Sequence, residues 1–264
     1  MKLGLISDSF RLDFEGGIRA ASKLGVSGVQ KYLTYGDFSA ENMTPERVRE
    51  VRDIMSSNGL VFSAICGDFG IDLDNDEVID RSKRVLDAAK ELGCGIVTTH
   101  IGHIEETDSP RMEKLRAHAY ELASYADSMQ AKFACETGTE KAVVMRAFLD
   151  QLGAKGLCVN MDPANLVMVA KDDPVEAVYT LREYIVHTHA KDGIVTDQTP
   201  HGWLEVPLGT GGVDWDRYLA ALHEIGYTGY LTVEREVGDQ PAEDIGMAVR
   251  FLREKLAKLS IPLE

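Results

Sequence analysis

Short apolar segments alternate with longer amphipathic segments along almost the whole chain. Each apolar segment is long enough for one strand, and they lie near residues 2–7, 28–32, 60–66, 95–100, 131–136, 156–161, 184–189 and 230–235. Between them, apolar residues recur at helical spacing, as in the stripe of residues 44–58 formed by Val48, Val51, Ile54 and Met55. Regular alternation of strands and helices predicts an α/β fold built on a parallel sheet.

Capping residues and glycines mark the helix boundaries. Thr44-Pro45, Ser109-Pro110 and Asp173-Pro174 each place a capping residue before a proline at the first helical position. Glycine ends five helices just before the next strand, at Gly25, Gly59, Gly93, Gly153 and Gly226. No linker interrupts the alternation of strands and helices, and no Gly-x-Gly-x-x-Gly motif follows a strand. This pattern decides between two α/β folds. It predicts a single (β/α)8 TIM barrel over residues 1–264, with a doubly wound open sheet as the alternative.

The charge of the chain argues against two classes of partner. Its formal net charge is −15, whereas binding to the phosphate backbone of nucleic acids needs a basic face. The same charge opposes adhesion to an anionic membrane, and no apolar run approaches the ~20 residues of a membrane helix. We therefore expect neither nucleic acid nor a membrane as a partner.

The cysteines and the first residues indicate a reducing compartment. No Cys-x-x-Cys pair is present, and each cysteine lies in or beside a predicted strand, at Cys66, Cys94, Cys135 and Cys158. Buried, reduced thiols are typical of cytosolic proteins. The opening run MKLGLISDSF indicates a strand rather than a signal peptide, because Asp8 ends its apolar part. We expect a cytoplasmic protein.

Four strands in the second half of the chain end in residues that bind hard divalent metals: Glu136, Asp162, His189 and Glu234. One acidic residue after a strand is usually a helix cap or a solvated loop residue, and one histidine in an apolar strand is usually a core residue. Four in phase would instead meet at the carboxyl end of the barrel, where such folds build active sites. Three oxygen ligands and one nitrogen favour one Mn²⁺ ion, with Mg²⁺ or Co²⁺ as alternatives, over structural zinc.

Two connections are unusually long, at residues 101–108 and 190–213. Loops of this length in a compact domain are usually functional lids or disordered insertions. The second contains Trp203 beside Gly202 and then a glycine-rich turn. We expect a lid there, and a contact between subunits of a homo-oligomer is the alternative.

Several stretches of the chain resemble the xylose isomerase-like TIM barrels, specifically the sugar phosphate isomerase/epimerase group with its ketose 3-epimerases and inosose dehydratases. The stretches are ACET at 134–137, MDPAN at 161–165, HTHAKD at 187–192, and the tail 207–236 with its glycine-rich turn and Val-Asp-Trp helix start. The resemblance covers the barrel and is most specific in the C-terminal half. It implies the same barrel fold.

The resemblance also implies a site. In that family one metal ion is held by Glu, Asp, His and Glu from the last four strands, which correspond to Glu136, Asp162, His189 and Glu234. The two glutamates are implied to act as acid and base in a sugar isomerase or epimerase. A proton next to a carbonyl can be removed once a cation stabilises the enediolate oxygen. A carboxylate on each side of the substrate lets one face lose the proton and the other regain it.

Three positions depart from the family pattern. Many ketose epimerases have His three residues after the metal-binding Asp, where this chain has Asn165, which can bond a sugar hydroxyl but cannot titrate. Many members have Glu at the end of the second strand, where this chain has Gln30, and some have Arg in place of Val195. The alternative is therefore a metal-dependent dehydratase acting on a keto-sugar or keto-inositol. An apurinic endonuclease-like phosphodiesterase is less favoured, because it needs more histidines and a basic groove.

Three residues are the first candidates for contacting a small sugar or polyol, and a fourth has two alternative interpretations. His100 ends the fourth predicted strand, and Asn165 follows the metal-binding Asp, so we expect both at the mouth of the barrel. Lys191 could hold a phosphate or an oxyanion, or could be a solvated lysine. His103 is either a further substrate contact or a solvated loop residue. No arginine cluster or P-loop indicates a phosphorylated substrate.

Overall fold

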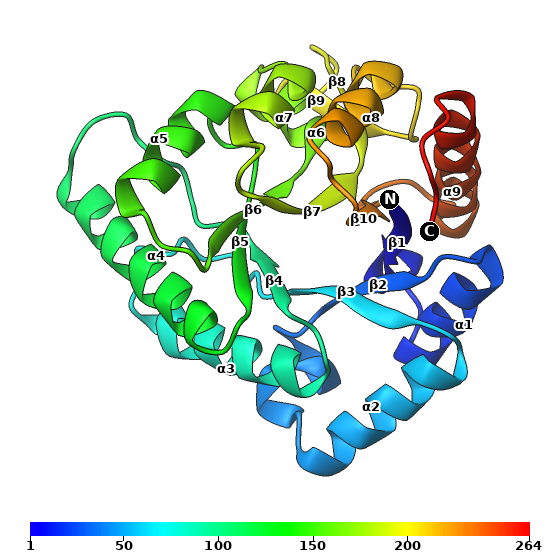
Figure 1. The fold of residues 1–264 in the computed structure, drawn as a ribbon, viewed down its shortest axis with the longest axis horizontal. Helices are drawn as coiled ribbons and strands as arrows, with labels where there is room; N and C mark the ends of the chain where they lie inside the picture. Colours follow the sequence, from blue (N-terminus) through cyan, green and yellow to red (C-terminus); the bar gives the residue numbers. More distant parts are fainter.

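Eight parallel strands close into a barrel in the computed structural model, which describes residues 1–264 (Figure 1). Around the barrel the strand order is β1-β10-β7-β6-β5-β4-β3-β2. The strands are β1 (Lys2–Ile6), β2 (Gly28–Tyr32), β3 (Val61–Cys66), β4 (Ile96–Thr99), β5 (Lys132–Glu136), β6 (Leu157–Met161), β7 (Ile185–Ala190) and β10 (Tyr230–Val233). All eight predicted strands are present, and the predicted TIM barrel is confirmed.

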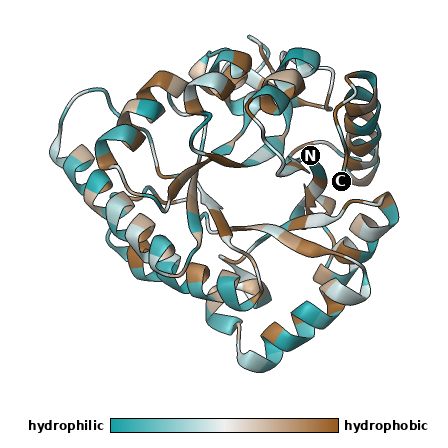
Figure 2. Ribbon diagram, in the orientation of Figure 1, coloured by the Kyte–Doolittle hydropathy of each residue, from teal (hydrophilic) through white to brown (hydrophobic).

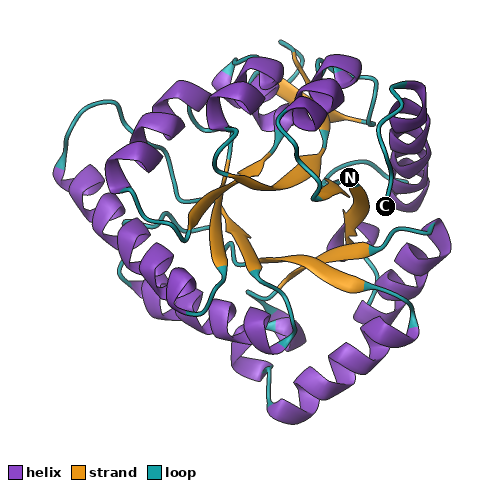
Figure 3. Cartoon of the chain, in the orientation of Figure 1, coloured by secondary structure: helices purple, strands orange, loops and turns teal.

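The helices form a ring outside the strands (Figure 3). The longer ones are α1 (Phe14–Leu24), α2 (Pro45–Ser57), α3 (Glu77–Glu91), α4 (Pro110–Ser128), α5 (Ala142–Leu152), α7 (Pro174–Leu181), α8 (Trp215–Glu224) and α9 (Pro241–Lys258). The short ones are the 3₁₀ segments η1 (Ser7–Phe10), η2 (Gly36–Phe38) and η3 (Ala40–Asn42), the single turn α6 (Pro163–Asn165) and the π-helical turn η4 (Leu166–Ala170).

Local sequence signals set the helix ends as predicted. The Thr44 hydroxyl accepts a hydrogen bond from the Arg47 N–H (3.3 Å) at the start of α2. Ser109 does the same for Met112 (3.1 Å) at the start of α4. Gly153 follows α5 in the left-handed region, with φ of 59°, where a side chain would be strained. These caps satisfy backbone groups that a helix end leaves unpaired.

Apolar side chains fill the layer between strands and helices. A single cluster of 67 buried residues includes side chains from strands and helices alike, so both element types share one core. Figure 2 shows hydrophobic residues along the strands and more hydrophilic residues on the outer helix faces. Val48, Val51 and Met55 of the predicted α2 stripe are buried, and the four cysteines are buried and free. No helix has the length and apolar character needed to cross a bilayer.

Within the predicted loop 190–213, residues 192–206 form an antiparallel hairpin. β8 (Asp192–Val195) pairs with β9 (Trp203–Val206). The buried carboxylate of Asp192 organises the segment that follows. It accepts hydrogen bonds from the N–H groups of Gly193, Gly209, Gly211 and Val213 and from the indole of Trp215. One carboxylate therefore joins the start of the hairpin to the glycine-rich turn. The role of this segment as a lid stays a prediction.

Removing this carboxylate is expected to destabilise the protein strongly. In an Asp192→Ala variant several buried donors lose their acceptor, and each unpaired buried group costs about 1–3 kcal/mol. We expect the free energy of unfolding to fall by more than about 3 kcal/mol in urea denaturation. Asp197→Ala is the matched control, because Asp197 is exposed in the same hairpin, and it should change stability by less than about 0.5 kcal/mol. Equal stability of the two variants would refute this role of Asp192.

Candidate metal centre and active site

Four side chains converge at the carboxyl end of neighbouring barrel strands. Glu136 is the last residue of β5, Asp162 directly follows β6, His189 lies near the end of β7, and Glu234 directly follows β10. Because β5, β6, β7 and β10 are consecutive around the barrel, these side chains lie side by side. All four are buried, and one ligand atom from each lies within 4.8 Å of the others.

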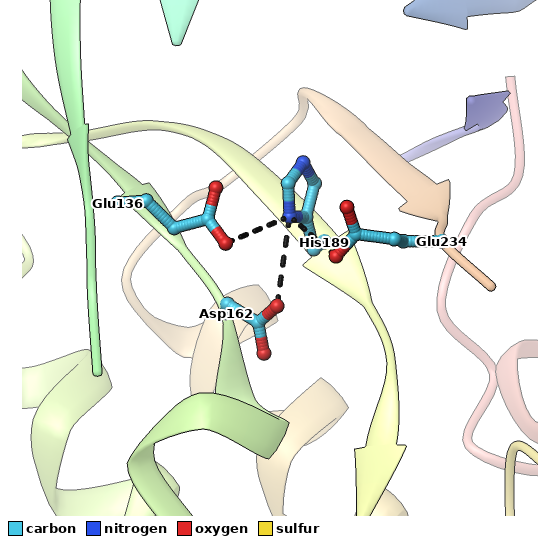
Figure 4. Close-up of side chains that lie close together, drawn as sticks. All are labelled: Glu136, Asp162, His189 and Glu234. Atoms are coloured by element: carbon cyan, nitrogen blue, oxygen red, sulfur yellow. Dashed lines mark ion pairs between the residues drawn. The ribbon is translucent and has the colours of Figure 1, made fainter. Parts of the chain in front are cut away.

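Figure 4 shows the three carboxylates directed at the ring of His189 from different sides. The Nδ1 atom of His189 lies 3.4 Å from Glu136 Oε1, 3.6 Å from Asp162 Oδ2 and 3.2 Å from Glu234 Oε2. This arrangement brings together the set predicted from the sequence. Its donor atoms, three carboxylate oxygens and one imidazole nitrogen, suit Mn²⁺, Mg²⁺ or Co²⁺.

Two of these carboxylates leave a buried oxygen without a hydrogen bond. Asp162 uses Oδ1 to cap the turn α6, accepting from the Asn165 N–H at 2.9 Å, while its Oδ2 has no hydrogen-bond partner. Glu234 Oε2 is likewise without one, although it lies close to cationic groups. Buried polar atoms without partners are rare in proteins. The four side chains therefore fit a divalent cation, which would satisfy both oxygens.

The charges of the cluster shift the pKa values of Glu136, His189 and Glu234. Burial would raise the pKa of Glu136, but His100 and His189 together hold it below the usual value. Burial would also raise the pKa of Glu234, but the positive charges of His189 and Lys191 have the larger effect and lower it. For His189, burial would lower the pKa, but Glu234 and Glu136 raise it well above the usual value. Both glutamates are consequently ionised near neutral pH.

Lys191 is buried and paired rather than solvated. Its Nζ lies 3.1 Å from Glu234 Oε2 and also contacts Glu236. Burial would lower its pKa, but the neighbouring carboxylates, Glu234 first among them, raise it well above the usual value. The alternative prediction from the sequence, that Lys191 is solvated, is therefore wrong. Lys191 stands as a fixed positive charge beside one of the candidate metal ligands.

His100 lies at the mouth of the barrel and is held by a residue that the sequence analysis missed. Its Nδ1 is 2.8 Å from Asp68 Oδ2, and its Nε2 is 3.5 Å from Glu136 Oε1. Glu136 and then Asp68 raise the pKa of His100 to about 10, against the effect of burial. Asp68 comes two residues after β3. Its position at the same barrel end as the metal set is the signal that could have identified it.

Asn165 contacts the metal set directly, and His103 does not. The Asn165 Nδ2 donates to Glu136 Oε1 at 3.1 Å. Gly138 makes this close approach possible, because a side chain at that position would collide with Asn165. His103 is exposed, and its Nδ1 lies 3.8 Å from Glu140, so it is the solvated loop residue of the two alternatives.

Residues 18–255 match the family model described as xylose isomerase-like TIM barrel, which covers most of the chain. The chain belongs to the xylose isomerase-like TIM barrel family. The resemblance predicted from the sequence stretches is thus confirmed. No curated protein sequence matches the chain.

Solved structures with different activities share this fold. A xylose isomerase domain protein from Planctomyces limnophilus is 27% identical, with a TM-score of 0.83 over 92% of each chain. A probable 3-DHS dehydratase from Bacillus anthracis is 17% identical, with a TM-score of 0.79 over 96% of this chain and 99% of that one. A 3-keto-D-glucoside 4-epimerase from E. coli is 17% identical, with a TM-score of 0.74 over 96% and 99%. The last two likenesses show the fold alone.

In this member of the xylose isomerase-like family, a cavity opens beside Glu234. It has a volume of about 280 Å³, close to the lower end of the range for small-molecule sites, which is about 300–1,000 Å³. Its lining residues are Ile6, Asp8, Ser9, Arg11, Tyr32, Tyr35, Glu234, Arg235 and Glu236. The lining is mostly polar, with two tyrosine rings. These tyrosines and Asp8 lie at or just after the carboxyl ends of β1 and β2. The sequence predicted no site residue there.

Proposed function

We propose that this protein is a divalent-metal-dependent sugar isomerase or epimerase that removes a proton next to a carbonyl group. The observation that carries the proposal is the convergence of three buried carboxylates on one histidine, with two carboxylate oxygens left without hydrogen bonds. Membership of a family that includes sugar-modifying enzymes supports the same reading. The substrate is a small sugar or polyol.

Glu136, Asp162, His189 and Glu234 are the residues that would hold the metal. When bound, a divalent cation would stabilise the negative charge that develops on the substrate carbonyl oxygen as the proton leaves. Mn²⁺ is the first choice, and Mg²⁺ or Co²⁺ are alternatives.

Glu136 and Glu234 are the acid and base of the proposed reaction. They belong to different strands and approach His189 from different directions. Because their pKa values are lowered, each is ionised near neutral pH and able to accept a proton. One glutamate removes the proton from one face of the substrate carbon. The other glutamate takes up a proton from solvent and delivers it to the opposite face, and the first glutamate then releases its proton to solvent. This exchange inverts the carbon.

Three further residues are proposed to bind the substrate. His100 and Asn165 both contact Glu136, so they border the space in which a substrate carbon would meet that carboxylate. Lys191 contacts Glu234 and can stabilise an oxyanion on the opposite side. Each can donate a hydrogen bond to a sugar oxygen.

A dehydratase remains the second candidate, and one observation favours it. His100 carries a raised pKa of about 10, so it is protonated at neutral pH and lies at the mouth beside Glu136. Expelling a β-hydroxyl after proton abstraction requires an acid for the leaving oxygen. His100, oriented by Asp68, could supply that proton.

The experiment that tests both candidates is a substrate panel. Mn²⁺-loaded protein would be incubated with free ketoses, their phosphates and keto-inositols, and the products identified by NMR. New epimers or isomers support the first function, and loss of water supports the second. An abasic-site DNA duplex serves as the negative control, because a chain of net charge −15 is expected to bind no nucleic acid. Cleavage of that duplex, with no change in any sugar, would contradict the proposal.

Metal affinity is expected to rise with pH. In the metal-free protein the raised pKa of His189 keeps its ring protonated, and a metal ion must displace that proton. Protons and metal therefore compete, and lower pH weakens binding. We expect the association constant for Mn²⁺ to fall about tenfold for each pH unit below neutrality. Calorimetric titration in buffers of different ionisation enthalpy measures the proton release, and an affinity that is independent of pH would contradict this prediction.

A further inference from the structure

His189 is held on the side opposite the carboxylates by the side chain of Gln30. The ring Nε2 lies 3.1 Å from Gln30 Oε1, whereas Nδ1 faces Glu136, Asp162 and Glu234. Gln30 is in β2, across the barrel from β7, and both side chains are 1% exposed. Apart from Asn160, whose Nδ2 lies near both of them, the two ring nitrogens have different neighbours. The amide of Gln30 determines what Nε2 can do.

The orientation of the Gln30 amide is fixed by a chain of hydrogen bonds. The Thr98 hydroxyl donates to the backbone carbonyl of Ile65 at 3.4 Å. Its oxygen is then the acceptor for the Gln30 Nε2–H at 3.1 Å. Because the amide nitrogen points to Thr98, the amide oxygen points to His189. An amide oxygen can only accept, so the His189 Nε2 must carry a hydrogen.

Asn160 provides a competing contact, and its own bonds resolve the competition. Its Nδ2 lies 3.2 Å from the same His189 nitrogen. The same Nδ2 donates to Glu136 Oε2 at 3.1 Å, and the Asn160 oxygen lies 2.8 Å from the His187 Nδ1. A protonated Nε2 has no lone pair for an Asn160 hydrogen, so Gln30 is its hydrogen-bond partner. Asn160 instead supports Glu136.

We propose that Gln30 is a positioning residue for the metal centre, because its amide oxygen keeps a hydrogen on His189 Nε2 and so leaves Nδ1, on the carboxylate side, as the ring nitrogen that would hold the metal ion. The inference rests on the proposed metal site but not on the sugar reaction. Histidine ligands to metals generally donate their second N–H to an oxygen acceptor, and losing that acceptor typically weakens metal binding about 10–100-fold. In this chain an uncharged amide supplies the acceptor.

The test compares two substitutions at Gln30. Gln30→Leu removes the acceptor with little change in volume, and Mn²⁺ binding measured by calorimetric titration should weaken about 10–100-fold. Gln30→Glu keeps an acceptor oxygen whether or not it is protonated, so it should retain most of the affinity. Ser63→Ala removes a buried strand hydroxyl that has no hydrogen bond and is the control that leaves affinity unchanged. Melting temperatures of the chelated proteins show whether each variant is folded.

A second measurement reports the tautomer itself. In Mg²⁺-loaded protein with labelled histidines, long-range ¹H–¹⁵N spectra should place the ring proton of His189 on Nε2 in the wild type. Two results would overturn the inference while leaving the metal site intact. One is a ring proton on Nδ1, and the other is a Gln30→Leu variant that folds and binds Mn²⁺ as tightly as wild type. Wild-type protein that binds no divalent ion would overturn both. Weakened binding in Gln30→Leu alone supports the inference even if no sugar is turned over.

Discussion

Glu136→Gln and Glu234→Gln variants are each expected to lose about 10²–10⁴-fold in turnover, the usual effect of removing a general base. A carboxamide keeps an oxygen that can face a metal ion, but it cannot accept a proton at neutral pH. The metal should remain bound if the substitution removes only the base. Steady-state kinetics on the substrate identified by the panel measures the loss, and elemental analysis of the same samples measures the metal.

Solvent deuterium exchange separates the roles of the two glutamates. If each works on its own face of the carbon, either variant should exchange the proton of one epimer and fail to interconvert the two. The epimer that still exchanges should differ between the variants. Exchange is followed by NMR from each pure epimer in D₂O, before the products accumulate.

Glu140→Gln is the matched control for this pair. Glu140 is a buried glutamate in the loop after β5, and burial raises its pKa. It accepts a hydrogen bond from the Ile104 N–H at 3.4 Å and is not among the four converging residues. Turnover should stay near wild type in this variant. Wild-type turnover in both Glu136→Gln and Glu234→Gln would refute the two-glutamate mechanism.

The barrel could be predicted because its signals are local. Each strand is a short apolar run, and each helix start and end is determined by residues a few positions apart, as with Thr44 and Arg47 at α2. Eight repeats of that unit match the eight strand–helix units of a closed (β/α)8 barrel. The β8–β9 hairpin escaped prediction because Asp192 holds it through contacts with residues 209–215, which only the folded chain brings together.

The candidate metal set could be predicted for a related reason. A residue at the end of a strand has a fixed place once the barrel is known, so Glu136, Asp162 and Glu234 could be grouped from their phase alone. The two interpretations of such a residue, helix cap and metal ligand, do not exclude each other. Asp162 uses one oxygen as a cap and directs the other into the site.

The supporting residues could not be predicted, because their roles depend on side-chain contacts across the barrel. Gln30 meets His189, which is 159 positions away in sequence. Lys191 could be a solvated residue by sequence alone, and only the folded arrangement surrounds it with Glu234 and Glu236. Asp68 belongs to no recognisable sequence motif, and its role follows only from its contact with His100.

Removal of the metal is expected to abolish activity, and Asp162→Asn is expected to have the same effect without a chelator. Asn can keep the cap of α6 through its oxygen, so the substitution chiefly replaces the unpartnered Oδ2 by an amide N–H₂, which cannot bind a cation. Losing a ligand should weaken Mn²⁺ binding more than the about 10–100-fold effect of losing a supporting residue. Both epimer interconversion and deuterium exchange should disappear together, in contrast to the glutamine variants.

Thermal unfolding gives this prediction a readout that does not depend on knowing the substrate. A ligand that binds only the folded state at 100 times its Kd adds about 2.7 kcal/mol of stability, so Mn²⁺ should raise the melting temperature of the wild type and not that of Asp162→Asn. Asp173→Asn is the control, because Asp173 caps α7 by accepting from the Val175 N–H at 2.8 Å and lies outside the four converging residues. It should keep the Mn²⁺-dependent shift. Full activity in protein shown to be metal-free would refute the metal centre, because the enediolate charge would then be stabilised without a cation.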